Sequence, residues 1–164
     1  MKQFVLSLLV SNHFGVLTRV TNLFSRRGFN IKSLAVGETE NPALSRMTIL
    51  TEGDDRKGDQ IKKQLNKLED VKKSMDIPED LLICRELLLI KVRCPEEKAD
   101  ELSALLSDFG AKKLAQQSEC AIVEMTGPSA TIDKFIMKSN HEFGVMEVCR
   151  TGEAALENSN QTIY

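Results

Sequence analysis

The sequence contains no tryptophan, and aromatic residues make up only 5% of its 164 residues. Aromatic side chains are the platforms on which single-stranded nucleic acids stack, so their scarcity argues against that kind of binding. Basic residues are not in excess either. The formal net charge is −2, whereas a nucleic-acid-binding domain normally carries a clear basic surplus. The composition therefore predicts no nucleic-acid partner.

Long apolar runs are also missing. The longest is far shorter than the roughly 20 residues that a membrane-spanning helix needs. Met1-Lys2-Gln3 leads directly into a strand-like segment, with no pattern of a signal or transit peptide. We therefore expect a cytoplasmic protein with no membrane partner. Its cysteines show no Cys-x-x-Cys spacing, so we expect small buried or edge hydrophobes in a reducing compartment.

Motifs that carry chemistry are absent as well. The sequence has no GxGxxG or Walker loop, no GxSxG and no HExxH. With only two histidines, His13 and His141, and no paired cysteines, a zinc site lacks its ligands. The carboxylates fall in turns and on predicted helix faces, where solvated or capping roles are the simplest explanation. The sequence thus predicts no catalytic residue and no metal site.

What the sequence does contain is a repeated order of strands and helices. In the first half, helices over 15–27 and after Asp54-Asp55 are combined with strands over 3–10, 31–37, 46–52 and 71–75. This β-α-β-β-α-β order is that of the ferredoxin-like fold. The second half repeats it, with helices after Pro95 and Pro128 between strands over 83–93, 112–118, 120–126 and 145–151.

This repetition predicts an α+β protein of two ferredoxin-like βαββαβ domains. Pro78-Glu79-Asp80 breaks the pattern between them, so we place the domains at 1–77 and 78–164. Residues 157–164 are polar, and we expect them to form a mobile tail.

The candidate binding site is the loop Asn12-His13-Phe14-Gly15-Val16-Leu17, between the first predicted strand and helix. Unpaired N–H groups at a helix start carry partial positive charge and favour a carboxylate. Gly15 would let a ligand approach these groups, and the Asn12 amide could orient its polar atoms. A plain strand-to-helix turn explains the same spacing, and spacing alone favours the turn. Asn30, just after Gly28, is likewise most simply a turn residue.

The second predicted strand adds another clue. In a ferredoxin-like sheet this strand lies at an edge, yet Ile31–Val36 carries a single charge. An exposed apolar edge invites pairing with another chain. We therefore expect a homodimer formed through this strand.

Several stretches carry a family resemblance: Asn12-x-x-Gly15-Val16-Leu17-x-Arg19-Val20, Leu23–Leu34 with Arg26-Arg27-Gly28-Phe29-Asn30-Ile31, Ser45–Ile49, Arg85-Glu86-Leu87 and Arg150-Thr151-Gly152. Together they resemble the small, regulatory subunit of acetolactate synthase (acetohydroxyacid synthase). The resemblance covers most of the chain and is densest in the N-terminal part.

The resemblance implies an N-terminal ACT domain and a C-terminal domain of related topology. In this family two ACT domains pair side by side and hold a branched-chain amino acid, usually valine, at their interface. The positions that match the family's effector contacts are Asn12, Gly15, Val16 and Leu17 of one subunit and Asn30 and Ile31 of the other. The sequence departs from the family at Phe14, because a small residue or proline often precedes the glycine.

The family's small subunit has no active site and binds no cofactor itself. It activates a separate catalytic large subunit, which carries thiamine diphosphate, FAD and Mg²⁺, and it confers end-product inhibition on that subunit. An alternative is a free-standing ACT-type amino-acid sensor that regulates another enzyme. A self-sufficient enzyme is disfavoured, because the sequence offers no nucleophile, metal or cofactor motif.

Overall fold

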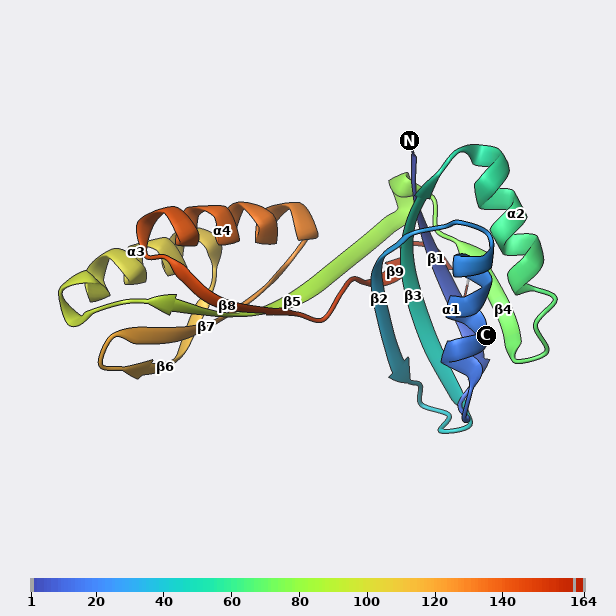
Figure 1. Ribbon diagram of the computed structural model, residues 1–164, viewed down its shortest axis with the longest axis horizontal. Coiled ribbons are helices and arrows are strands. Elements are labelled where there is room, and N and C mark those ends of the chain that lie inside the picture. Colours follow the sequence, from blue (N-terminus) through green and yellow to red (C-terminus); the bar gives the residue numbers. More distant parts are fainter. Residues whose placement is uncertain (1, 161, 164) are drawn as a thin grey trace. The chain divides into compact units, whose positions relative to one another are not determined.

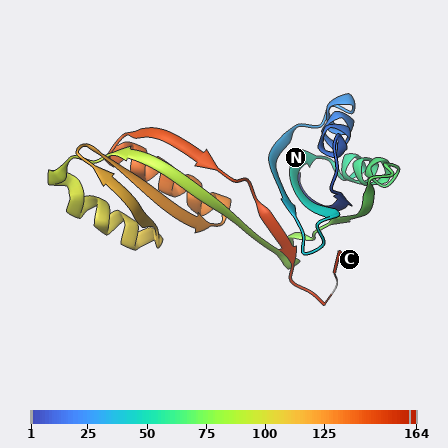
Figure 2. The same ribbon diagram turned by 90° about the horizontal axis from the view of Figure 1, so that it is seen from below.

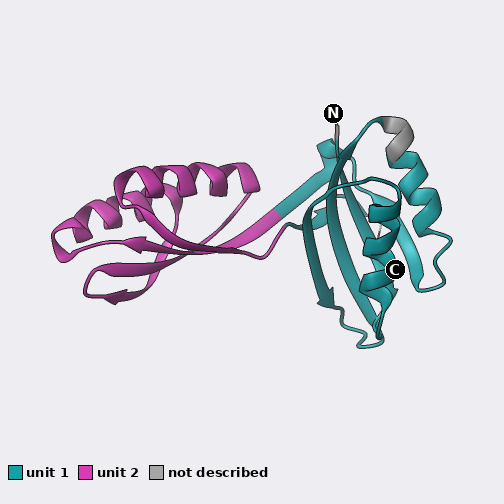
Figure 3. Ribbon diagram, in the orientation of Figure 1, with its two compact units in different colours: residues 1–84, 153–164 teal, residues 85–152 magenta. Residues whose placement is uncertain are grey.

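The computed structural model describes residues 2–160 and 162–163, and they form two compact units (Figure 3). Unit 1 comprises residues 1–84 together with 153–164, and unit 2 comprises residues 85–152. Among the described residues, no helix is long and apolar enough to cross a membrane. Each unit has its own sheet, with two helices packed on one of its faces (Figures 1 and 2).

Unit 1 has a four-stranded antiparallel sheet in the order β2-β3-β1-β4. Its elements are β1 (Lys2–Ser11), α1 (Val16–Arg26), β2 (Ile31–Glu38), β3 (Leu44–Gly53), α2 (Asp55–Leu65) and β4 (Val71–Asp76). The expected order of elements is therefore confirmed. Strands β2 and β4 are the two edges of the sheet.

Strand β1 is central and is buried on both faces, which is why its sequence is a continuous apolar run. Leu6 and Leu8 point toward the helices and pack in one cluster with Val20 and Phe24 of α1. Burying one such side chain fully contributes about 1.5–3 kcal/mol, so this cluster is the main support of the unit.

Unit 2 repeats the arrangement with the strand order β6-β7-β5-β8. Its elements are β5 (Leu82–Arg93, which begins in unit 1), α3 (Ala99–Phe109), β6 (Lys112–Gln117), β7 (Cys120–Gly127), α4 (Ser129–Glu142) and β8 (Val145–Arg150). A short 3₁₀ turn, Glu96–Lys98, lies between Pro95 and α3. The predicted pair of ferredoxin-like domains is confirmed.

The C-terminal segment contains a strand that the sequence analysis did not predict, just before the expected tail at 157–164. Residues Ala154–Glu157 form strand β9, which pairs with β5. Ala155 is buried with Val5 and Leu50, on the face of the unit 1 sheet opposite α1 and α2. The Arg46 side chain donates to the Ala155 carbonyl (3.0 Å). The Glu153 N–H donates to the Ser33 hydroxyl (2.9 Å).

The units therefore divide differently from the expected boundary at 77/78. Ile77 belongs to the same buried cluster as Ala155, and Glu79–Leu81 forms a 3₁₀ turn inside unit 1. The change of unit falls between Cys84 and Arg85, within the continuous strand β5. The boundary therefore lies within a strand and not at the proline-containing segment.

The end of the chain is also packed. Lys73 donates to the carbonyl of Thr162 (2.6 Å), and the Ile163 side chain is only 2% exposed. We predict that Ile163→Asp lowers the free energy of unfolding of unit 1 by about 2 kcal/mol or more, because the buried apolar contact is lost. Leu156→Asp is the matched control, since Leu156 is 59% exposed and should tolerate the change. Scanning calorimetry of both variants measures the effect, and equal melting temperatures would contradict it.

A partly buried ion cluster ties the last strand of unit 2 to the rest of that unit. Arg150 on β8 donates to both carboxylate oxygens of Glu86 (2.9 and 2.6 Å) and to Asp133 on α4 (2.7 Å). The hydrogen bonds that Arg150 donates to Glu86 are the main reason that the pKa of Arg150 lies above its usual value. The Glu86 side chain is only 4% exposed, and the Arg150 guanidinium lies 2.6 Å from its carboxylate.

We predict that Arg150→Met lowers the stability of unit 2 by about 2–3 kcal/mol, because it leaves the Glu86 carboxylate buried without its cation. Lys91→Met is the control, since Lys91 pairs with exposed Glu147 (3.3 Å) on the same sheet. An exposed pair of this kind contributes about 0–1 kcal/mol. Urea unfolding followed by circular dichroism measures both changes, and a similar small loss in the two variants would contradict the prediction.

Candidate functional site

The predicted loop turns from β1 into α1 at Gly15, which adopts a left-handed conformation with φ 84°. Residues other than glycine rarely adopt this left-handed backbone conformation, so the turn depends on Gly15. The first turn of α1 contains no acidic residue, and no side chain caps the helix. The Val16 N–H donates to the His13 carbonyl (3.5 Å), so the N–H groups of Leu17 and Thr18 are the ones available to an anion.

The Asn12 side chain holds this loop against the β2–β3 hairpin. Its Nδ2 donates to the Glu38 carboxylate (3.1 Å) and to the Pro42 carbonyl (2.9 Å), and its backbone N–H donates to the Ala43 carbonyl (2.8 Å). Because Nδ2 is used twice, Oδ1 is the remaining acceptor. Among the described residues, no group donates to Asn12 Oδ1. Asn12 thus lies at the C-terminal end of β2 and presents a hydrogen-bond acceptor.

A carboxylate from a distant turn fixes the other side of the loop. Asp70, just before β4, accepts from Arg19 Nε (2.6 Å) and lies 3.0 Å from His13 Nε2. Its backbone carbonyl also accepts the N–H of Ser11 (2.9 Å). His13, Arg19 and Asp70 are the residues that sequence reasoning missed as supports of the site. The signal is not local, because the carboxylate is 51 residues from Arg19.

Side chains around Gly15 divide between core and surface. Val16 is buried in the unit 1 core, so only its backbone can face a ligand. Leu17 is 43% exposed, and Phe14 is fully exposed. The loop therefore exposes two neighbouring apolar side chains.

Asn30 and Ile31 lie at the opposite end of the sheet. Ile31 pairs with Thr51 on β3, whereas Leu44, seven residues earlier on β3, pairs with Ser11 beside the loop. Seven residues of strand span about 23 Å. Within one chain, therefore, the structure brings Asn12, Gly15, Val16 and Leu17 together but leaves Asn30 and Ile31 apart from them.

The N-terminal end of β2 is fixed by two contacts. The Thr51 hydroxyl donates to the Asn30 carbonyl (2.7 Å). Lys32 is paired with Glu52, and its hydrogen bond lowers the pKa of the Glu52 carboxyl. The Asn30 side chain is exposed, so it is free to contact another molecule.

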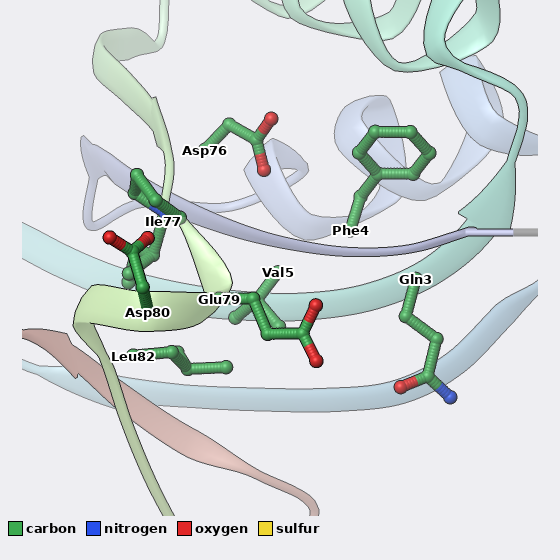
Figure 4. A pocket seen from close by; sticks show the side chains of 9 residues that line it. Gln3, Phe4, Val5, Asp76, Ile77, Glu79, Asp80 and Leu82 are labelled. Carbon is green, nitrogen blue, oxygen red and sulfur yellow. The ribbon is translucent and has the colours of Figure 1, made fainter.

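A hollow of 630 Å³ elsewhere in unit 1 has no catalytic constellation. Its lining includes Val5 and Leu82 together with the carboxylates of Asp76, Glu79 and Asp80 (Figure 4). Asp76 is already paired with Lys62 (3.5 Å). Over residues 2–160 and 162–163, no group of three or more His, Cys, Asp or Glu side chains is placed to hold a metal ion.

Comparison with known families assigns both halves of the chain. The family described as AHAS small subunit-like ACT domain matches residues 6–73, and that described as small subunit of acetolactate synthase matches residues 85–159. A probable acetolactate synthase small subunit of Methanothermobacter thermautotrophicus is 41% identical over 160 residues, covering 97% of this chain and 95% of the relative. This chain belongs to the acetolactate synthase small-subunit family.

Other members of the small-subunit family agree along the whole chain. The probable small subunit of Archaeoglobus fulgidus is 44% identical over 156 residues, covering 95% of this chain and 97% of that protein. The crystal structure of the acetolactate synthase small subunit from Thermotoga maritima matches with a TM-score of 0.90 at 40% identity. It covers 98% of this chain and 100% of that one. Unit 1 is thus an ACT domain, as the resemblance implied.

We predict that Asp70→Asn destabilises the ACT unit by about 1 kcal/mol, because a neutral amide cannot accept two charge-assisted hydrogen bonds from Arg19 and His13. The loss of stability is small because the side chains of both donors are half exposed to solvent. Glu69→Gln is the matched control, since the adjacent Glu69 side chain is exposed. Thermal unfolding compares the two variants, and an unchanged Asp70→Asn melting temperature would refute the role of this carboxylate.

Proposed function

We propose that this chain activates the catalytic large subunit of acetolactate synthase and makes it sensitive to valine. Support for the partner comes from the family, whose members are named as small subunits of that enzyme. The proposal of valine sensitivity rests on the position of the site residues at opposite ends of β2. Asn12 lies at one end and Asn30 at the other.

Pairing of two chains through β2 would unite those two ends. Strand β2 is a sheet edge, and its Val36 side chain is 46% exposed. When two copies of an edge strand pair antiparallel about a two-fold axis, the end of one strand lies beside the start of the other. The Asn12–Leu17 loop of one chain then meets Asn30 and Ile31 of its partner, and the dimer contains two such sites.

The groups gathered there suit an α-amino acid. The N–H groups at the start of α1 would bind the carboxylate, where the helix dipole favours negative charge. Asn12 Oδ1 would accept a hydrogen bond from the ammonium group. Ile31 of the partner chain would contact the aliphatic side chain. A single methylene changes affinity by only about 1–3 kcal/mol, so related branched-chain amino acids should compete with valine at the same site.

The chemistry of the synthase would then belong to the catalytic partner. In this proposal thiamine diphosphate, FAD and Mg²⁺ are bound by the large subunit, and this chain binds only the effector. The complex would act in the cytoplasm, where the four free cysteines stay reduced. Effector binding at the interface of two ACT domains would change the arrangement of the dimer and hence the activity of the bound catalytic subunit. Such coupling is typically about 1–3 kcal/mol.

Reconstitution with the catalytic subunit tests this function. We expect the wild-type chain to raise the rate and valine to lower it again. Gly15→Asp should keep activation and weaken valine inhibition at least about tenfold, because it adds a carboxylate at the proposed anion site and strains a left-handed position. Asn30→His should have the same effect from the other chain. Full valine inhibition in both variants would show that the site is misplaced.

A further inference from the structure

A groove on the helix-bearing side of unit 1 adjoins the loop described above, with which it shares Arg19. It runs between α1 and α2 and has a volume of 360 Å³. We name it the arginine groove, because Arg19, Arg26 and Arg27 line it together with Asn22, Leu23, Gln64 and Leu68. No carboxylate is among these lining residues, although the whole chain has a formal net charge of −2.

The charges of the arginine groove are mostly unneutralised. Among the described residues, the side chains of Arg26 and Arg27 have no ion-pair or hydrogen-bond partner. Arg19 lines the groove too, but it is paired: its Nε donates to Asp70, and its terminal nitrogens lie beside Gly15 at the start of α1. Elsewhere the chain pairs exposed lysines such as Lys91 and Lys138 with nearby carboxylates. Unpaired arginines on one helix face favour binding of an external anion.

The spacing of Arg19 and Arg26 along α1 limits what can bind. Arg19 and Arg26 are seven residues apart on α1, which corresponds to about 10 Å along the helix axis. One carboxylate or phosphate is too small to contact both groups. Half-buried Leu23 lies between them in sequence, and half-buried Leu68 faces it from beyond α2. The arrangement suits a chain segment with two carboxylates about 10 Å apart and an apolar side chain between them.

We propose that the arginine groove docks an acidic segment of the catalytic large subunit. This inference rests on the function proposed above, which supplies that partner. Carboxylates seven residues apart on a helix, or three apart on an extended segment, have the required spacing. The apolar side chain would cover Leu23 and Leu68 and remove their exposed surface from water. Charge complementarity of this kind mainly increases the rate and the selectivity of association.

The test compares charge reversals in reconstituted complexes. In Arg26→Glu/Arg27→Glu, the concentration needed for half-maximal activation should rise about tenfold, because two attractive contacts become repulsive. Lys112→Glu/Lys113→Glu is the matched control, since it reverses two adjacent exposed charges on β6 of unit 2. High salt should weaken activation by the wild type and have less effect on the arginine variant. Direct binding is measured by sedimentation, and folding by circular dichroism and the valine-induced thermal shift.

Each outcome decides the inference. If the arginine variant and the wild type need the same concentration for half-maximal activation, the groove is not a docking site, but the proposed function stands. A wild-type chain that neither binds nor activates the catalytic subunit would overturn both. If the glutamate variant fails to fold, Arg26→Gln/Arg27→Gln replaces it, and a several-fold rise in half-activation is then required. A thermal shift with inorganic phosphate that the arginine variant abolishes, without any change in activation, would identify a small-anion site instead.

Discussion

The proposed effector site depends on the unpaired backbone groups at the edge of β2. An edge strand leaves a row of backbone N–H and C=O groups without strand partners, and such an edge is an opening for another chain unless it is blocked. Strand β4, at the other edge of the same sheet, carries Lys72, Lys73 and Asp76, whereas β2 exposes Val36. The proposed dimer would pair the β2 edge, and the same pairing would bring Asn30 and Ile31 of one chain to the Asn12–Leu17 loop of the other.

The loop at Gly15 is held by contacts from two sides. Asn12 ties it to the end of β2, and Asp70 ties it to the turn before β4. These contacts orient the amides of α1 and leave Asn12 Oδ1 as an acceptor. A loop held in this way pays little ordering entropy when a small ligand binds. The same carboxylate holds Arg19, so the effector loop and the arginine groove share one anchor.

The return of the C-terminal segment shows what a sequence pattern misses. Four residues at Ala154–Glu157 give too short a signal to predict a strand, and their strand pairing depends on residues about 70 positions earlier. Residues of the family motif turn out to hold this segment: Arg46 binds the Ala155 carbonyl, and Ser33 accepts the Glu153 N–H. The sequence around Pro78 suggested a linker. The neighbouring Ile77 is nevertheless buried, because it packs against residues far away along the chain.

The sequence by itself determined the order of strands and helices, the repeat of the ferredoxin-like unit and the position of the Gly15 turn. These features follow from local periodicity, from breakers and from one glycine conformation, all of which act over a few residues. The tertiary structure decided the boundary within β5, the anchoring of the loop by Asp70, and the separation of Asn12 from Asn30 by the length of β2. Each of these depends on residues brought together only by sheet register and core packing, which leave no local trace in the chain.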